Sequence, residues 1–179
     1  MSTSGDRLRT PNRRWAGSDF QDPPRTEGGV ALCGACRAAS ACRLGVERER
    51  LDEAGTAWFD VSCPREQEGG PNVAHGGWTA SVLDECLGHV PLLNSTLSVT
   101  AELSVSFVKP VPVDRPLRVR AWVDKREGSR WYISGEMTLL PGGAVLARAS
   151  GIWVTRDTGH FDRHERWLAE QDASATPSG

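Results

Sequence analysis

The sequence predicts an α+β fold in which one long helix packs against an antiparallel sheet. Two observations predict it. Long stretches alternate between apolar and polar residues, which is typical of strands that bury one face. One stretch, residues 76–90, instead repeats its apolar residues with the spacing of a helix. The expected order is two strands, this helix and four more strands, so the apolar stripe of the helix should cover one face of the sheet.

The first two strands are predicted to form a hairpin. They cover residues 44–51 and 56–63, and the turn Asp52-Glu53-Ala54-Gly55 separates them. A stretch rich in Gly, Glu and Pro follows over residues 64–72 and is predicted to be a loop.

The helix is predicted to begin at Gly76 and to end before Pro91, since proline cannot continue the hydrogen bonds of a helix. Its apolar stripe consists of Ala80, Val82, Leu83, Cys86, Leu87 and Val90. A second stripe is small and polar and consists of Gly77, Ser81, Asp84 and Gly88. Small residues around one carboxylate indicate close approach by a ligand or by a second helix.

The four strands after the helix form the rest of the predicted sheet. They cover residues 97–107, 117–124, 130–140 and 144–155. Proline or glycine turns separate them, at Pro110, Gly128 and Pro141. The folded domain is therefore expected over residues 42–157. Residues 1–41 are predicted to be a mobile arm with a cysteine-containing lead-in, and residues 158–179 a short helix and tail that packs on the domain or on a partner subunit.

Composition excludes some functions. Of 179 residues, 21 are Lys or Arg and 23 are Asp or Glu, which gives a formal net charge of −2. Such a balance is not that of a polycation that coats nucleic acid, so we expect no nucleic-acid partner. No apolar run approaches the roughly 20 residues of a membrane helix, so no membrane partner is expected. The basic, polar N-terminus lacks the apolar region of a secretory signal, and we expect a cytoplasmic protein.

The five cysteines are expected to be reduced thiols. Cys33 and Cys36 have metal-ligand spacing, and Cys42 is a possible third ligand. Zinc prefers four ligands in two close pairs, and Cys63 stands alone in a predicted strand. The prediction is therefore that the protein holds no metal, with a zinc-dependent interaction protein as the remote alternative.

The start of the helix carries the triplet His75-Gly76-Gly77. Two glycines there leave the first backbone N–H groups exposed at the positive end of the helix dipole, which suits an oxyanion or a polarised carbonyl. Asp84 follows nine residues after His75, about half a turn round the helix and roughly 13 Å along its axis. The two features would meet only across the two-fold axis of a dimer, where one helix start faces the carboxylate of the other subunit.

With these residues the sequence resembles the hotdog-fold acyl-CoA thioesterase superfamily, the phenylacetate-degradation type. The resemblance covers about residues 42–156. It is carried by His75-Gly76-Gly77, by Asp84-Glu85, by the strand from Thr100 to Pro110 with its aromatic Phe107, and by the later glycines Gly128 and Gly151. It implies a hotdog fold, a long central helix wrapped by a curved antiparallel sheet of five to six strands, assembled as a homodimer or a homotetramer.

The resemblance also implies site residues. Asp84 would be the general base or the nucleophile, and the backbone N–H of Gly76 or Gly77 would polarise the thioester oxygen. Thr100 would place the water or the Asp. The sequence departs from the family at Gly69, where relatives often carry an amide six residues before the His, and Asn72 is the nearby amide that could replace it.

Further residues are expected to bind the substrate. Lys125, Arg126 and Arg130 flank the turn where the family contacts the nucleotide phosphates. Trp78, beside the two glycines, would wall the acyl pocket, and Ser81 lies on the small-residue stripe.

The expected activity is hydrolysis of acyl-CoA or acyl-carrier thioesters to free acid and thiol, without a cofactor. Two alternatives remain open. One is a hotdog module that binds acyl thioesters without cleaving them, and the other is a hotdog hydratase or dehydratase, which would need His75 or His89 paired with an acid.

Overall fold

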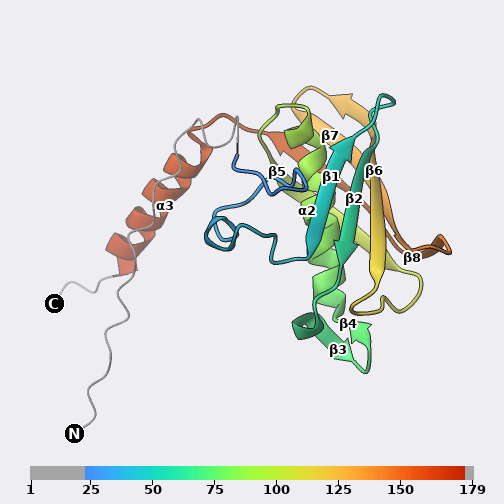
Figure 1. Cartoon of the computed structure of the whole chain (residues 1–179). Helices are drawn as coiled ribbons and strands as arrows, with labels where there is room; N and C mark the ends of the chain where they lie inside the picture. The colour runs from blue at the N-terminus through green and yellow to red at the C-terminus, as the bar shows by residue number, and fades with distance from the viewer. Residues whose placement is uncertain (1–22, 176–179) are drawn as a thin grey trace, which may run out of the picture.

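The computed structural model describes residues 23–175, and Figure 1 shows a curved sheet that wraps one long helix. The strands are β1 (Val46–Leu51), β2 (Ala57–Ser62), β5 (Ser98–Phe107), β6 (Pro116–Glu127), β7 (Arg130–Leu139) and β8 (Ala144–Thr155). Their order in the sheet is β1-β2-β6-β7-β8-β5, and neighbouring strands are antiparallel. The predicted α+β class, with six strands and one helix against them, is confirmed. The two sheet edges are β1 and β5.

The central helix α2 spans Gly76–Leu93, which is three residues longer than predicted. Pro91 lies inside its last turn and does not end it. A proline there removes one hydrogen bond close to the helix end, where the cost is small, and its ring is buried in the core. The helix ends at Asn94, whose side-chain amide donates to the Val90 carbonyl at 2.8 Å.

The apolar stripe of α2 forms the core together with the inner face of the sheet. Val82, Leu83, Cys86, Leu87 and Val90 are all fully buried. They pack with the inward residues of β2, β6, β7 and β8, among them Phe59, Val119, Ile133 and Trp153. The opposite stripe, from Gly77 to Gly88, stays at the surface or half-buried. Packing of the helix therefore turns Asp84 away from the core.

The loop predicted over residues 64–72 contains short elements. A 3-10 turn η2 (Arg65–Gln67) precedes a small hairpin of β3 (Glu68–Gly70) and β4 (Val73–Ala74). Asn72 turns the chain with a positive φ of 58°. The hairpin leads directly into α2. The Ala74 N–H donates to the Val111 carbonyl at 2.8 Å, and this bond holds the hairpin against the segment between β5 and β6.

Residues 23–33, named here the strap, lie along β1 and over α2 (Figure 1). The Glu49 N–H donates to the Gly28 carbonyl at 3.3 Å, and Val30 is fully buried. Gly28 must be a glycine because a Cβ there would lie 2.1 Å from the Glu47 carbonyl oxygen. This part of the predicted arm therefore packs on the domain, followed by a short 3-10 turn η1 (Arg37–Ala39). Residues 1–22 lie outside the described residues.

The helix α3 (His160–Ala175) occupies the place of the predicted short C-terminal helix and is longer. Figure 1 shows it extending away from the sheet, and its described side chains from Phe161 onward are exposed. The expected packing of this helix on the domain is therefore not present within one chain. None of the described helices is long and apolar enough to cross a membrane.

Candidate active site

A cavity of about 340 Å³ lies beside the middle of α2. The helix supplies one side through Asp84, Gly88 and Leu92. The start of β5, Trp153 of β8 and the strap supply the others. Four segments far apart in the sequence therefore enclose one space, and the Asp84 carboxylate lies in its wall.

Asp84 is held in place by a threonine on the edge strand. Thr100 Oγ1 of β5 donates a hydrogen bond to Asp84 Oδ1 at 2.9 Å. Burial raises the pKa of the Asp84 carboxyl, the Thr100 hydrogen bond lowers it in part, and the neighbouring charge of Glu85 raises it further. Within the described residues no cation forms an ion pair with Asp84.

This environment makes Asp84 a stronger base than an exposed aspartate. A carboxylate with a raised pKa gains more free energy when it accepts a proton than an exposed carboxylate does. The second oxygen, which Thr100 does not contact, is available to a water or to an electrophilic carbon. The structure thus brings together two of the sequence-predicted residues, Asp84 and Thr100.

The start of α2 is capped by the histidine of the triplet. His75 is the N-cap, and its Nδ1 accepts a hydrogen bond from the Gly77 N–H at 2.9 Å. The Gly77 N–H is therefore occupied by this cap. No acceptor in the described part of the chain pairs with the Gly76 N–H, so Gly76 is the better candidate for a donor to a ligand.

The residues before the triplet explain the departure from the family pattern. A Cβ at Gly69 would lie 2.7 Å from the His75 Cα, so a larger residue does not fit there. Arg65 orients the Asn72 side chain, since its Nη1 donates to Asn72 Oδ1 at 3.1 Å. Neither Gly69 nor Asn72 lines the cavity beside Asp84.

The helix start and the carboxylate do not meet within one chain. Gly76 and Asp84 are eight residues apart, which is about 12 Å along the helix axis. None of His75, Gly76 and Gly77 lines the cavity. Instead, Gly76 lies at the surface beside Phe107 of β5, whose ring would be 3.7 Å from a Cβ at that position.

Two other predicted residues lie outside the cavity. Trp78 is buried in the core, where its Nε1 donates to the Leu44 carbonyl at 3.1 Å. It therefore does not wall the cavity beside Asp84. Ser81 is exposed, and its Oγ donates back to the Gly77 carbonyl at 2.8 Å. Trp153, which does line the cavity, is the aromatic residue that the structure places there.

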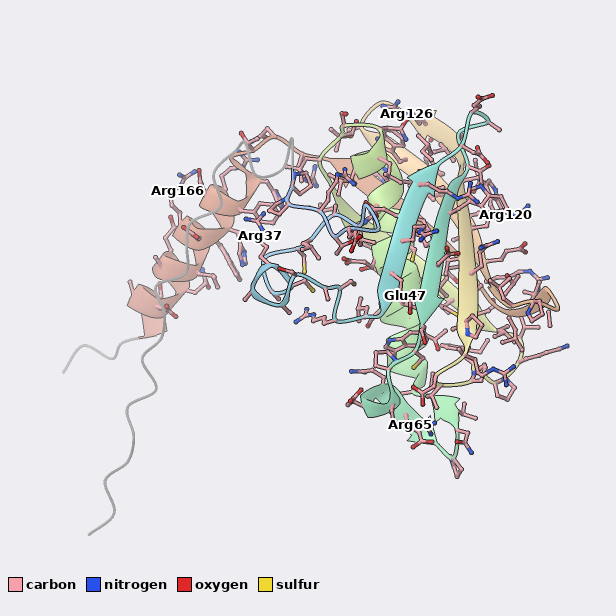
Figure 2. The ribbon with its side chains drawn as sticks, viewed as in Figure 1. Arg37, Glu47, Arg65, Arg120, Arg126 and Arg166 are labelled. Atoms are coloured by element: carbon pink, nitrogen blue, oxygen red, sulfur yellow. The ribbon has the colours of Figure 1, made fainter. Side chains whose placement is uncertain are left out.

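The predicted phosphate-binding cations surround the turn between β6 and β7. Lys125 pairs with Glu127 at 2.8 Å, and the Arg126 guanidinium lies 3.6 Å from the centre of the Trp131 ring. Arg130 is exposed. Figure 2 shows Arg126 at one end of the sheet and Arg65, near the helix start, at the other. These cations thus lie far from the α2 start of their own chain.

The cysteines are free thiols in the structure. Burial raises the pKa of Cys33 and Cys42, and raises that of Cys63 to about 11, so these thiols stay protonated. Over residues 23–175 no group of three His, Cys, Asp or Glu side chains is arranged to hold a metal ion. Cys33 alone of the five lines the cavity.

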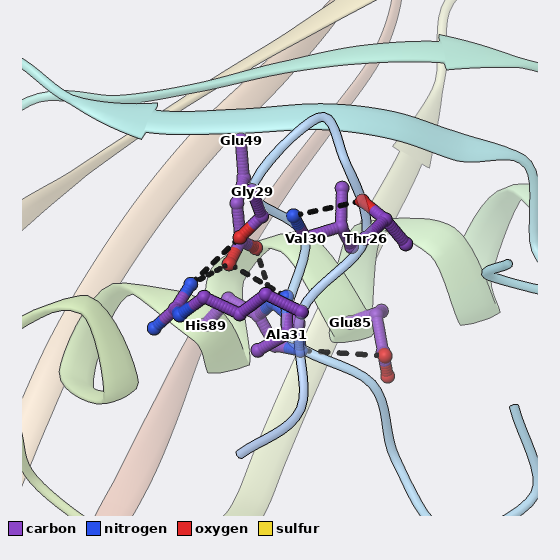
Figure 3. Close-up of polar contacts among 8 residues, drawn as sticks. Thr26, Gly29, Val30, Ala31, Glu49, Glu85 and His89 are labelled. Carbon is purple, nitrogen blue, oxygen red and sulfur yellow. Dashed lines mark hydrogen bonds and ion pairs between the residues drawn. The ribbon is translucent and has the colours of Figure 1, made fainter. Parts of the chain in front are cut away.

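Sequence reasoning missed a buried charged network that joins the strap to α2 (Figure 3). Glu49 of β1, whose side chain is 1% exposed, accepts hydrogen bonds from Arg25 Nη1 at 2.7 Å and from the Ala31 N–H at 2.9 Å. Its other oxygen lies 2.6 Å from His89 Nδ1, and His89 Nε2 lies 3.3 Å from Glu85. In the sequence Glu49 stands in a run of charged residues, Glu47 to Arg50, so no sequence signal distinguishes it.

The network fixes the charge of His89. Burial alone would lower the pKa of His89, but the hydrogen bonds to Glu49 and Glu85 outweigh it and raise the pKa to about 9. His89 is thus an imidazolium at neutral pH. The Glu85 pKa is lowered, chiefly by its hydrogen bond to His89. The negative charges of Glu49 and Glu85 therefore balance the positive charges of His89 and Arg25.

Comparison with known proteins shows what this chain resembles. Residues 71–146 match the family model of the thioesterase superfamily. An uncharacterized protein of Schizosaccharomyces pombe is 31% identical over 98 residues, which cover 52% of this chain and 56% of the relative. An acyl-coenzyme A thioesterase of Bos taurus, THEM4, is 27% identical over 90 residues, which cover 50% of this chain and 37% of the relative. The matched region is thus about half or less of these relatives' lengths.

Solved structures show the same fold. The PaaI protein of E. coli, from the phenylacetic acid degradation operon, superposes with a TM-score of 0.57 at 18% identity, over 67% of this chain and 87% of that one. A hypothetical thioesterase of Streptococcus pneumoniae, solved with coenzyme A, superposes with a TM-score of 0.57 at 15% identity, over 62% and 85% of the two chains. The resemblance to the hotdog-fold thioesterase superfamily is therefore confirmed, through the fold and through the match of residues 71–146.

Proposed function

We propose that this protein hydrolyses acyl-CoA thioesters, with Asp84 as the catalytic carboxylate. The observation that carries the proposal is the Asp84–Thr100 pair on the wall of the cavity, where the pKa of Asp84 is raised and no cation among residues 23–175 forms an ion pair with it. A neutral thioester carbonyl needs an activated oxygen nucleophile and a donor for the developing oxyanion. Asp84 supplies the first, either as a base for water or as the nucleophile itself.

The oxyanion donor in this proposal is the Gly76 N–H of a second copy. The separation of Gly76 and Asp84 along α2 excludes a shared site within one rigid helix, whereas a two-fold dimer places each helix start near the carboxylate of its partner. The free edge of β5 favours such a dimer. No strand in the described part of the chain pairs with the outer edge of its ten residues, and Phe107 at its end is 59% exposed. The strap covers part of the other edge, β1.

Coenzyme A as the carrier fits the comparisons. Relatives of this chain include a protein named as an acyl-coenzyme A thioesterase, and a solved structure of the same fold holds coenzyme A. Lys125, Arg126 and Arg130 remain the proposed contacts of its phosphates, through the dimer. The cytoplasmic location stays an expectation from the sequence.

The buried pair of His89 and Glu85 favours hydrolysis over hydration. A hotdog hydratase needs a neutral histidine as base, and a His–Glu pair does line the cavity. His89, however, is held as an imidazolium between two carboxylates, with a pKa of about 9. It cannot accept a proton at neutral pH, so the base in this cavity is Asp84.

Hydrolysis of a panel of acyl-CoA esters tests the proposal, with release of free thiol as the measurement. We expect turnover by the wild type and a loss of about 10²-fold or more in kcat for Asp84→Asn, the range for removal of a general base. Glu53→Gln, an exposed carboxylate in the β1–β2 turn, is the matched control and should keep full activity.

Full activity of Asp84→Asn would refute the role of this carboxylate. Absence of thiol release from the wild type would leave the binding module, which acyl-CoA should then stabilise against heat. Loss of the enoyl absorbance of crotonyl-CoA without thiol release would instead show a hydratase.

A further inference from the structure

The cavity beside Asp84 extends along the helix away from the carboxylate. Asp84 and Thr100 stand at one end, and Leu92 and Leu97 line the other. Asp84 and Leu92 are eight positions apart in α2, which is about 12 Å along the axis. A substrate whose reacting carbon lies at Asp84 would therefore direct its tail towards Leu92.

The lining favours an uncharged tail. Leu92, Leu97 and Leu32 offer apolar surface. Apart from Asp84, the charged residues in the wall are Glu85 and His89, which are paired with each other, and Glu49 behind them is paired with His89. No charge is left over in that network to bind an ionised tail, and a charge placed beside it would remain unpaired in a partly buried space.

The strap closes one side of this cavity. Pro23, Ala31, Leu32 and Cys33 all line it, and Leu32 is 4% exposed. The strap is not held by apolar contacts alone. Glu49 binds the Ala31 N–H and the Arg25 side chain, so both ends of the segment are tied to β1. The wall that the strap forms is therefore fixed in position before a ligand arrives.

We infer that the strap is the specificity element of this site, and that Leu32 sets the length of the acyl tail. The inference rests on the proposed function for the position of the thioester. A cavity of about 340 Å³ is near the lower limit of small-molecule sites, so it suits an apolar acyl group of medium length. The tail lies between Leu32 on one side and Gly88 and Trp153 on the other.

Binding of stable thioether analogues of acyl-CoA tests the inference without any turnover. Calorimetric titration measures the affinities of the wild type, Leu32→Trp and Leu32→Ala for acetyl, octanoyl and dodecanoyl analogues. The larger indole of Leu32→Trp should lower the affinity for the octanoyl analogue at least tenfold and change the affinity for the acetyl analogue less than twofold. Leu32→Ala should enlarge the space for the tail and raise the affinity for the dodecanoyl analogue relative to the affinity for the octanoyl one.

Ala35→Trp is the matched control, because Ala35 is exposed and lies just beyond the strap, outside the cavity lining. It should change neither affinity. Equal weakening of the acetyl and octanoyl analogues by Leu32→Trp, or an unchanged length preference in Leu32→Ala, would overturn the inference. Should Leu32→Trp not fold, Leu32→Ala decides alone.

The two proposals can fail separately. If the wild type binds the octanoyl analogue but releases no thiol from octanoyl-CoA, the proposed hydrolysis is wrong and the proposed acyl-binding pocket is supported. If it hydrolyses acyl-CoA while the Leu32 variants keep the wild-type length preference, the strap is not the specificity element. Failure of the wild type to bind any analogue would refute the pocket.

Discussion

Asp84 owes its chemistry to its neighbours. The small residues beside it on α2 leave its carboxyl uncovered by other side chains of the helix, and β5 supplies one hydroxyl. Burial and the Glu85 charge raise its pKa, while Thr100 opposes them. The balance of these effects sets the pH at which the base becomes active, so the threonine is the residue through which that pH can be changed.

Removal of the Thr100 hydroxyl should move the acidic limb of the pH profile. Asp84 must be deprotonated to act, so kcat/KM rises with pH through its pKa. Thr100→Val deletes the hydrogen bond that lowers this pKa, and the limb should move to higher pH. On the acidic side we expect a fall of roughly tenfold in kcat/KM, the effect of losing one hydrogen bond to a charged group.

Thr100→Ser is the control, because it keeps the hydroxyl and should keep the limb in place. A pH–rate profile of the three proteins decides the matter. An unchanged limb in Thr100→Val would show that the pair in the structure does not tune the base.

At the scale of the elements, the strap and α2 are joined by a charge network that titrates. His89 has a folded-state pKa of about 9, above its ordinary value of 6.5. Such a group stabilises the folded state fully below pH 6.5, and the contribution is lost as pH rises through 9. The loss is on the order of 3 kcal/mol for a shift of this size.

The melting temperature of the wild type should therefore fall between pH 6.5 and pH 9. His89→Gln keeps a polar side chain without the charge, and its melting temperature should be lower at pH 6.5 and nearly constant up to pH 9. Thermal unfolding of both proteins across this range is the measurement. A parallel fall in the two proteins would place the titrating group elsewhere.

The sequence was sufficient for the elements whose pattern is local. Alternation along β5 to β8 and the stripe from Val82 to Val90 are properties of neighbouring residues, and each appears where it was predicted. The end of α2 was predicted three residues early because Pro91 breaks helices in general, whereas here it lies in the last turn and is buried.

The sequence was not sufficient for the strap. Glu49 and Ala31 are 18 positions apart, and their hydrogen bond exists only because the strap lies along β1 in the fold. Asp84 and Thr100 are likewise far apart in the sequence, and their roles were expected only from a resemblance. The places of Leu32 and Trp153 in the cavity wall had no signal in the local sequence. Trp78 was predicted to wall the acyl pocket because it lies beside two glycines. In the fold it is buried in the core and does not line the cavity.

For the whole molecule, the two edges of the sheet differ. β1 is partly covered by the strap, whereas among residues 23–175 no strand covers the outer edge of β5 along its ten residues. An open edge of this length invites pairing with another chain, and Phe107 beside Gly76 adds exposed apolar surface. The site as proposed is complete only when that edge is occupied.

Phe107→Glu should therefore weaken the dimer and the activity together. A charge on the exposed end of β5 opposes burial at the interface, so we expect a shift towards monomer in analytical ultracentrifugation and at least a tenfold lower kcat/KM at low protein concentration. Leu51→Glu, at the end of the other edge strand, is the matched control and should change neither. A monomer with full activity would contradict the shared site.

The attachment of the strap through one glutamate has a practical consequence. The segment that faces the tail of the ligand is separate in the chain from the helix that carries the acid, and Ala31 is 18 positions away from its anchor, Glu49. Chimeras that exchange only residues 23–33 should transfer a preference among substrates from one scaffold to another, with the reactive machinery left as it is.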